Sequence, residues 1–152
     1  MQTFMLTWNP QQYRPNDLAE EVFQIETGEP YRGAWSTGRR KKLPVGSRVF
    51  LVRQGNDPRG VVAAGFTTTE PEPGESDDDH SLYCKLVWTM VLDDAKGHLL
   101  CLEELRNTPL LVNVPWGIQG GGREFASSEA AQLEVVWGAL IRRLGKSELS
   151  YL

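Results

Sequence analysis

The chain has 152 residues, of which 40% are hydrophobic and 24% are charged, a balance typical of one folded domain spanning residues 1–152. No apolar run reaches the roughly 20 residues that a membrane-spanning helix needs, and the N-terminus lacks the basic and apolar segments of a secretory signal. The net charge of −4 argues against nonspecific DNA coating, and two cysteines do not make a disulfide framework, so we expect a cytoplasmic protein with reduced thiols and no membrane partner.

The first half of the chain predicts strands and one helix, separated by turns. Strands are expected where short apolar runs meet Gly, Pro or Asn, over residues 3–8, 31–36, 48–54 and 61–69. A helix is expected over residues 16–28, where Asp17 caps the start, apolar residues share one face and Gly28 ends the pattern. The last two strands flank a short turn and predict a hairpin, with Gly65 as a candidate bulge.

The second half predicts one long strand and a long final helix. Residues 83–92 alternate in character, with Cys84 and Trp88 on the inward face. A short helix is expected over 101–107, an irregular glycine-rich segment over 109–125, and the most regular helical pattern over 127–144. The elements together predict an α+β fold in which mostly antiparallel strands form a curled sheet or small barrel with flanking helices.

Positive charge concentrates between residues 32 and 59, around the sequence Arg39-Arg40-Lys41-Lys42, which we call the basic run. Gly33 and Gly38 precede it with the spacing of a phosphate loop, but the Lys-Ser/Thr pair that this motif requires is absent. The basic run is therefore interpreted either as a solvated turn or as a contact for nucleic-acid phosphates.

No arrangement of residues predicts catalysis, a metal site or a cofactor. The sequence Asp77–His80 reads as part of a solubilising acidic loop, because consecutive residues in a loop point in different directions. Cys84 is expected to pack in the core, and no serine or cysteine has a recognisable histidine partner. The protein is expected not to be an enzyme.

The five tryptophans separate into two groups. Trp88 and Trp137 lie on the apolar faces of a strand and a helix and are expected in the core. The other three stand at element ends or in loops, beside Gly, Asn, Ser or Gln: Trp8, Trp35 and Trp116. Aromatic rings among small polar residues are typical of a pocket for a planar ligand.

Four segments, "FMLTWNP", "YRGAWSTG", "GSRVFLVRQGNDPRGVVAAG" and "PWGIQGGG", together resemble an EVE domain. This family belongs to the PUA-like superfamily, with the YTH and ASCH domains as relatives. The resemblance extends from Phe4 to Leu144 and is greatest to the EVE modules fused to His-Asn-His nucleases in modification-dependent restriction enzymes.

The resemblance implies a PUA-like fold that reads 5-methylcytosine or a related modified base in DNA, flipped into an aromatic cage. The residues that would line this base pocket are Trp8, Asn9, Trp35, Ser36, Gly38, Trp116 and Gln119. The residues that would hold the flanking phosphates are Arg39, Arg40, Lys41, Lys42, Arg53, Arg59 and Arg123.

This chain departs from the fused enzymes because it carries no nuclease segment, so we expect it to read without cutting, with a separate nuclease as a possible partner. Two alternatives remain open. The same pocket and basic run would serve a module that recognises modified or structured RNA. The acidic loop Glu70–Asp79 would instead serve a protein-interaction module in a defence or regulatory assembly.

Overall fold

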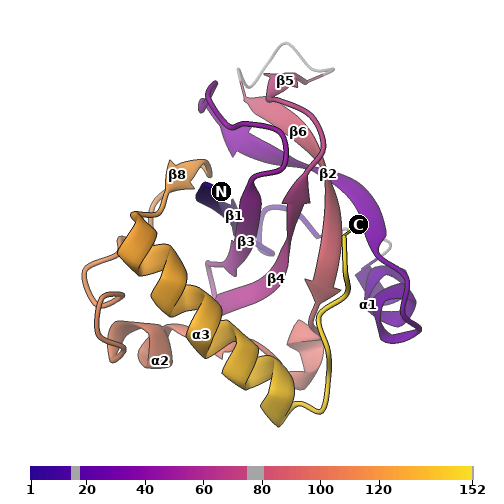
Figure 1. The fold of residues 1–152 in the computed structure, drawn as a ribbon, viewed down its shortest axis with the longest axis vertical. Helices are drawn as coiled ribbons and strands as arrows, with labels where there is room; N and C mark the ends of the chain where they lie inside the picture. The colour runs from indigo at the N-terminus through magenta and orange to yellow at the C-terminus, as the bar shows by residue number, and fades with distance from the viewer. Residues whose placement is uncertain (15–17, 75–80, 152) are drawn as a thin grey trace.

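A curled, mixed β-sheet forms the centre of the protein in the computed structural model, which describes residues 1–14, 18–74 and 81–151 (Figure 1). Across the sheet, the strands follow the order β2 (Tyr31–Gly38), β6 (Leu82–Val91), β4 (Gly60–Thr67), β3 (Arg48–Arg53), β1 (Thr3–Trp8) and β8 (Arg123–Glu124). The short strands β5 (Glu72–Pro73) and β7 (Leu100–Cys101) pair with β6 and β4. The sheet therefore pairs the N-terminal strand β1 with β8, which shortly precedes the last helix.

The expected α+β fold with a mostly antiparallel curled sheet is confirmed, with one exception in strand direction. β1 and β3 run parallel over their whole length, from the pair Thr3 and Arg48 to the pair Trp8 and Arg53. A parallel pair needs a long connection, which here passes through the helix α1 (Leu18–Glu26) and the strand β2. The parallel register places the ends of β1 and β3 side by side.

The hairpin of β3 and β4 forms the buried middle of the sheet. β3 is apolar between its two terminal arginines, and all six of its residues, Arg48–Arg53, are buried. The predicted bulge is confirmed, because the register of β4 against β6 shifts between Ala64 and Gly65. Gly65 also needs to be glycine for space, since an added Cβ would lie 2.2 Å from the Val87 carbonyl oxygen.

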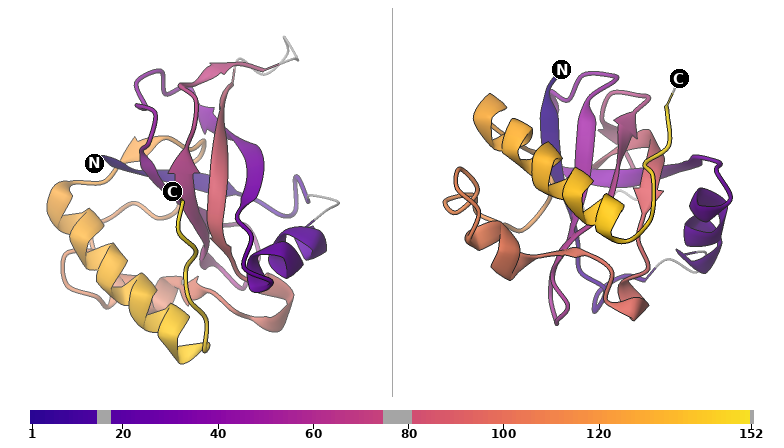
Figure 2. Two further views of the ribbon diagram at one scale, coloured as in Figure 1. Left: turned by 45° about the vertical axis from the view of Figure 1, so that its right-hand side comes forward. Right: turned by 60° about the horizontal axis from the view of Figure 1, so that its bottom comes forward.

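The helices cover the sheet from different sides (Figure 2). α1 packs against β6 and β2, whereas α3 (Ser127–Arg143) crosses the sheet and inserts Trp137 edge-on against Phe50 of β3, at 5.8 Å between ring centroids. The 3-10 helix η1 (Asp94–Lys96) follows β6, and the short α2 (Leu102–Arg106) follows β7. Asp17, the expected cap of α1, lies outside the described residues. Within the described ranges, no helix is both long and apolar enough to cross a bilayer.

The segment after α3 folds back along β6. The Leu149 N–H donates to the Thr89 carbonyl at 3.1 Å, and the Tyr151 ring stacks on Phe66 with centroids 5.5 Å apart. β6 alternates as predicted near Cys84, but this tail helps to bury both faces of its second half. The core tryptophans Trp88 and Trp137 are buried as expected.

Candidate functional site

The end of β1 and the edge strand β2 build the side of the protein where the predicted pocket residues gather. Trp8 is the last residue of β1, and the chain turns at once because the Asn9 carbonyl accepts the N–H groups of Gln12 and Tyr13, both at 3.0 Å. Trp35 lies in β2, where it pairs with Cys84 of β6. The loop after β1 and the exposed edge of β2 thus form two walls of a hollow.

We call this feature the β1–β2 hollow. Its volume is about 540 Å³, within the range of small-molecule sites. Its lining residues come from β1 and the loop that follows, from β2 and from β6: Thr7, Trp8, Asn9, Gln12, Tyr13, Ala34, Trp35, Ser36 and Tyr83. The structure therefore brings together four predicted pocket residues, from two parts of the chain: Trp8, Asn9, Trp35 and Ser36.

The two indoles in the hollow are fixed by their N–H groups. The Trp8 Nε1–H donates to the Tyr13 carbonyl at 2.7 Å, and the Trp35 Nε1–H donates to the Thr7 carbonyl at 3.0 Å. Behind the rings, Trp8 and Trp35 also border a cavity of only about 20 Å³, room for about one water molecule. A ligand in the hollow would meet rigid rings whose polar atoms are already satisfied.

Trp35 is the centre of a chain of aromatic contacts. The Tyr13 ring lies 6.0 Å from it at an interplanar angle of 66°, and the Trp88 ring lies 6.3 Å away at 76°. Both arrangements are the edge-to-face geometry that aromatic pairs favour. Trp8 is only 4% exposed, whereas Trp35 is half-buried and Tyr13 is exposed, so Trp35 and Tyr13 offer most of the accessible aromatic surface.

Two polar side chains border the aromatic surface. The Asn9 Oδ1 accepts the Gln11 N–H at 3.0 Å, which holds the amide at the rim of the turn. The Ser36 Oγ accepts the Gly38 N–H at 3.1 Å, and its own hydroxyl proton remains able to donate. An amide and a hydroxyl beside flat rings can orient the polar edge of a planar ligand.

Gly38 was predicted to let a ligand approach closely, but the protein's own backbone fills the space beside it. It has a φ of +63°, and an added Cβ would lie 2.9 Å from the Gly121 carbonyl oxygen. A Cβ on Gly122 would likewise lie 2.6 Å from the Thr37 carbonyl oxygen. The triple glycine at 120–122 therefore packs against the end of β2, and this explains its composition without a ligand.

Trp116 and Gln119 do not line the β1–β2 hollow. Trp116 is 2% exposed, its Nε1–H donates to the Leu111 carbonyl at 3.1 Å, and its ring lies against Phe125. Gln119 is exposed on the segment that leads to the triple glycine. Trp116 does lie in an irregular segment, as predicted, but that segment folds onto the core, so the expectation that Trp116 lines the base pocket is not supported.

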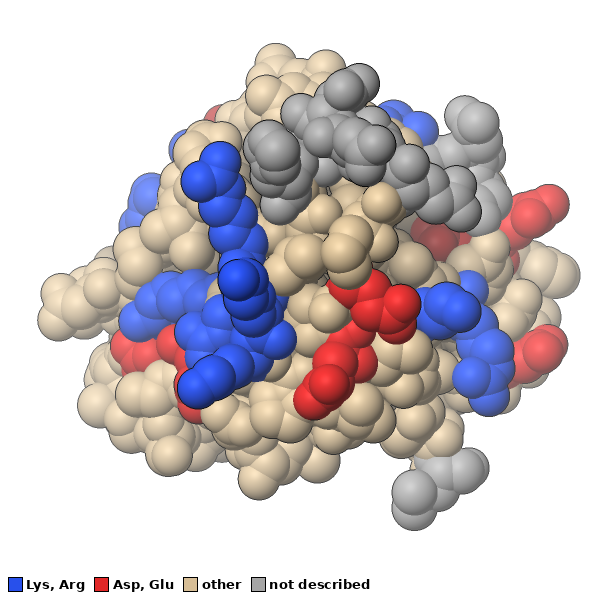
Figure 3. Space-filling model, turned by 90° about the horizontal axis from the view of Figure 1, so that it is seen from above, with Lys and Arg blue, Asp and Glu red and all other residues tan. Residues whose placement is uncertain are grey.

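The basic run contains two kinds of cation. Arg40 is half-buried, donates to Glu124 at 3.3 Å and lies over the Phe4 ring at 5.1 Å. The three other side chains are exposed, and no ion pair holds them within the described part of the chain: Arg39, Lys41 and Lys42. Viewed from the end of the molecule where the β2–β3 loop lies, the larger group of Lys and Arg side chains lies left of centre and a second group lies at the right, with acidic side chains between and beside them (Figure 3).

The remaining predicted phosphate ligands already have protein partners. Arg53 is only 6% exposed, and its guanidinium donates to Asp94 at 2.9 Å and to the Asn56 carbonyl at 2.7 Å. Its burial corrects the expectation that it extends an exposed phosphate track. Arg59 forms an exposed ion pair with Asp57 at 3.0 Å, and Arg123 pairs with Glu129 at 3.3 Å.

Sequence reasoning missed two aromatic residues of the hollow, Tyr13 and Tyr83. Tyr13 lies in the polar sequence Gln11–Arg14, so the signal used for the tryptophans, a large ring among small or polar residues, was present there too. Tyr83 pairs with Ser36 across β2 and β6, a long-range neighbour that no local pattern reveals. The thiol of Cys84, as expected, is buried, and burial raises its pKa to about 11, which keeps it protonated.

Comparison by sequence finds no protein-family model and no curated protein that matches the chain. Comparison by structure does find matches. A protein from Pseudomonas syringae is similar with a TM-score of 0.61 at 11% identity, covering 88% of this chain and 98% of that one. The Mmi1 YTH domain is similar with a TM-score of 0.54 at 11% identity, covering 93% of this chain and 78% of its own.

A crystal structure of the Mmi1 YTH domain in complex with RNA matches with a TM-score of 0.50 at 10% identity, covering 93% of this chain and 80% of the other. At these identities the likeness concerns the fold. This chain therefore has a curled-sheet fold similar to that of the YTH domain.

Proposed function

We propose that the protein is a non-catalytic reader of a modified base in nucleic acid, with 5-methylcytosine or a related cytosine in DNA as the favoured ligand. The base, flipped out of its stack, enters the β1–β2 hollow and stacks on Trp35. The observation that carries the proposal is the convergence of Trp8, Asn9, Trp35 and Ser36 on one hollow. Residues far apart in the sequence meet there in the combination that a flat, polar-edged ligand requires.

The exposed cations of the basic run support a nucleic-acid ligand. β2 leads from Trp35 and Ser36 in the hollow to Gly38, and Arg39 follows directly. A strand whose base occupies the hollow can therefore place a neighbouring phosphate near Arg39, Lys41 and Lys42. The acidic side chains beside this area and the net charge of −4 limit the electrostatic attraction, so affinity depends on the hollow.

The energies involved limit how strongly binding can discriminate a methylated base from an unmodified one. Flipping a base costs a few kcal/mol, and stacking on an aromatic side chain returns about 1–3 kcal/mol. One extra buried methyl adds about 0.8 kcal/mol, which is less than a factor of ten in affinity. Strong discrimination therefore needs a steric or polar penalty against the unmodified base.

RNA is the second candidate ligand, and the comparison with a structure of the Mmi1 YTH domain in complex with RNA favours it. The β1–β2 hollow and the basic run serve a flipped or unpaired base in either polymer. A single-stranded RNA has the advantage that its base need not leave a duplex. The two candidates differ in the polymer and share the same base site.

Fluorescence anisotropy at fixed, low salt tests the proposal. The probes are a duplex with one 5-methylcytosine, its 5-hydroxymethylcytosine and unmodified counterparts, and single-stranded RNA of the same sequence. We expect tighter binding to a modified duplex and a loss of about tenfold or more with Trp35→Ala, the scale of one stacking interaction.

Phe23→Ala is the matched control, because it removes an exposed aromatic ring on α1 that does not line the hollow. It should leave binding unchanged. Preference for RNA over every duplex, still lost with Trp35→Ala, would replace the DNA ligand by RNA. Weak binding to all probes, with the same affinity in the wild type and in Trp35→Ala, would exclude a base-reading hollow.

A further inference from the structure

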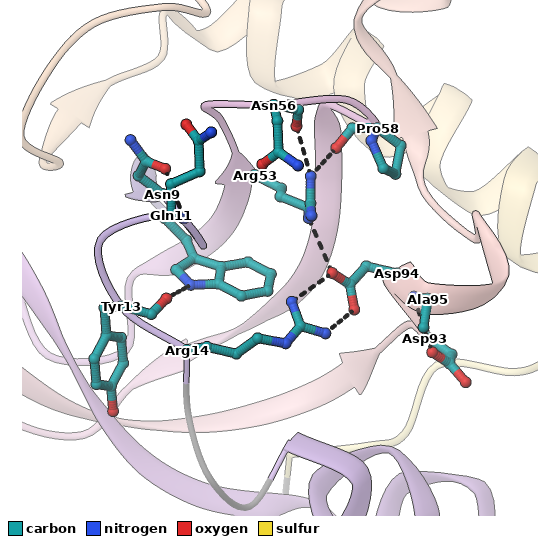
Figure 4. Close-up of polar contacts among 11 residues, drawn as sticks. Asn9, Gln11, Tyr13, Arg14, Arg53, Asn56, Pro58, Asp93, Asp94 and Ala95 are labelled. Carbon is teal, nitrogen blue, oxygen red and sulfur yellow. Dashed lines mark hydrogen bonds and ion pairs between the residues drawn. The ribbon is translucent and has the colours of Figure 1, made fainter.

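A buried carboxylate lies behind the β1–β2 hollow and is bound by two arginines (Figure 4). Asp94, the first residue of η1, accepts Arg53 Nε–H at 2.9 Å on its Oδ2. Arg14 binds it in a forked manner, with Nη1 at 3.1 Å from Oδ2 and Nη2 at 3.2 Å from Oδ1. Burial alone would raise the pKa of Asp94, but the hydrogen bonds and charges of the two arginines outweigh it and lower this pKa.

The two arginines differ in burial and in their partners, with side-chain exposures of 46% for Arg14 and 7% for Arg53. Arg53 ends β3, and its Nη1 donates to the carbonyls of Asn56 and Pro58 in the β3–β4 turn, so hydrogen bonds hold it through both Nε and Nη1. Arg14 ends the described part of the loop after β1 and is partly exposed. The Arg14–Asp94 ion pair thus connects the far end of this loop to the body of the protein, in addition to the Trp8–Tyr13 hydrogen bond and the Tyr13–Trp35 ring contact.

The same two arginines contact Trp8, which lines the hollow. The guanidinium carbons of Arg14 and Arg53 lie 5.5 Å and 5.6 Å from the centroid of the Trp8 ring. The Trp8 Nε1–H donates to the carbonyl of Tyr13, the residue before Arg14. A displacement of Arg14 would therefore also displace Tyr13 and Trp8, which both line the hollow.

We propose that Asp94 is a positioning residue for the β1–β2 hollow, and that through Arg14 it holds the loop residues 9–14, and with them Tyr13 and Trp8, in the ligand-binding arrangement. This inference rests on the proposed function and deepens it. It assigns part of the binding affinity to a carboxylate that does not line the hollow itself, because Asp94 lines the small cavity behind it and a separate surface depression beside α1.

A simpler role for Arg14, direct contact with a phosphate, makes opposite predictions. In the structure both terminal nitrogens of Arg14 are bound to Asp94, whose negative charge would repel a phosphate approaching the same group. If Arg14 contacts phosphate, removing the Asp94 charge should strengthen binding. If Asp94 positions the loop, the same change should weaken binding.

The first test measures the affinity of the Arg14→Gln variant for the nucleic-acid probe that the wild type binds most tightly. We expect a loss on the order of fivefold, the scale of coupling within one hydrogen-bonded network, expressed mainly as faster dissociation. The slope of log K against log salt should stay unchanged, whereas a lost phosphate contact would reduce it by about one. Arg143 is exposed to a similar extent as Arg14, and Arg143→Gln, which breaks its ion pair with Glu104 on α2, should have no effect.

Asp94→Asn separates the two roles of Arg14, and weaker binding with an unchanged salt slope is expected. Tighter binding, or a reduced salt slope in Arg14→Gln, would overturn the positioning role. Arg14→Lys keeps the charge but lacks the planar fork that matches both carboxylate oxygens, so it should recover only part of the affinity.

Hydrogen exchange in the free protein gives a test that needs no ligand. The amides of Gln11, Gln12 and Tyr13 are bonded to Asn9 and should exchange faster in Arg14→Gln than in the wild type, while those of β3 do not change. Unchanged exchange over residues 9–14 would overturn the inference. Absence of binding to every probe by the wild type would instead refute the proposed function, while hydrogen exchange would still decide whether Asp94 orders the loop.

Discussion

β3 buries an arginine at each end, and the two arginines serve different regions. Arg48 begins the strand and is 4% exposed; Arg53 ends it and is 6% exposed. Arg48 binds Glu134 of α3 at 3.1 Å and Glu148 of the C-terminal tail at 2.7 Å. Arg53 binds Asp94 at 2.9 Å, behind Trp8. One end of the strand therefore holds the tail and α3, and the other supports the candidate binding site.

The comparison shows that the positive charge between residues 32 and 59 is not one functional surface. The Glu148 carboxylate also accepts hydrogen bonds from Thr89 Oγ1 and from Trp137 Nε1, so the Arg48 network belongs to the packing of α3 and the tail. Arg39, Lys41 and Lys42, by contrast, are exposed. Burial and partners, which are set by the fold, decide which cations are available to a ligand.

The largest expected effect is on stability, at the Arg48 end. Glu148→Gln leaves Arg48 with only Glu134 as a charged partner in its network, and breaking a buried pair in this way should lower the free energy of unfolding by about 2–3 kcal/mol. Urea unfolding measures this loss. Nucleic-acid affinity, measured well below the unfolding temperature, should stay the same; a parallel loss of affinity would mean that the two ends of β3 are coupled.

Arg53→Met should affect both stability and binding. It removes one of the two arginines that bind Asp94, so we expect a loss of about 2 kcal/mol in the free energy of unfolding and weaker nucleic-acid binding through Trp8. The slope of log K against log salt should not change, because the guanidinium is buried. A salt slope reduced by about one would show instead that Arg53 contacts a phosphate.

Low pH should weaken the interaction between Arg48 and Glu148 and so lower the stability of the protein. Burial acts to raise the pKa of Glu148, but the hydrogen bond and charge of Arg48 outweigh it and lower that pKa below its ordinary value of 4.5. A lowered folded-state pKa contributes stability at pH values above 4.5 that is lost as pH falls through the folded value. Urea unfolding between about pH 5 and pH 3 should therefore show a flatter decline for Glu148→Gln than for the wild type.

The smallest effects on stability are expected in the basic run. Arg39→Gln, Lys41→Gln and Lys42→Gln should each change the free energy of unfolding by less than about 0.5 kcal/mol, because the side chains are exposed. Each substitution that removes a phosphate contact should reduce the slope of log K against log salt by about one. Salt slopes identical to the wild type in all three variants would exclude the basic run from the interface.

The sequence predicted the elements whose evidence is local. The alternation of β6 near Cys84, the apolar stripe of α3 with Trp137 and the bulge at Gly65 each depend on neighbouring residues and a known periodicity. The parallel pairing of β1 and β3 depends instead on segments about forty residues apart, so no local pattern indicated it. Trp8 and Trp35 were grouped by their polar neighbours, and the hollow brings them together.

The parts of the site that sequence did not predict depend on long-range burial. Trp116 has the same kind of neighbours as Trp35, yet its segment packs onto Leu111 and Phe125. Arg53 was grouped with Arg39 as a phosphate ligand, but Asp94, which lies beyond β4 and β6 along the chain, is its partner. Composition near a residue indicates what it can bind, whereas the fold determines whether it is accessible.

The indole N–H resonances of the five tryptophans test the central claim most directly, because each tryptophan gives one signal in a ¹⁵N-labelled protein. The signals are followed during titration with the tightest-binding probe of the panel. We expect the signals of Trp35 and Trp8, in the β1–β2 hollow, to shift strongly, while those of Trp116 and Trp137, in the core, stay in place. Binding that shifts Trp116 and leaves Trp8 and Trp35 unchanged would contradict the proposed site.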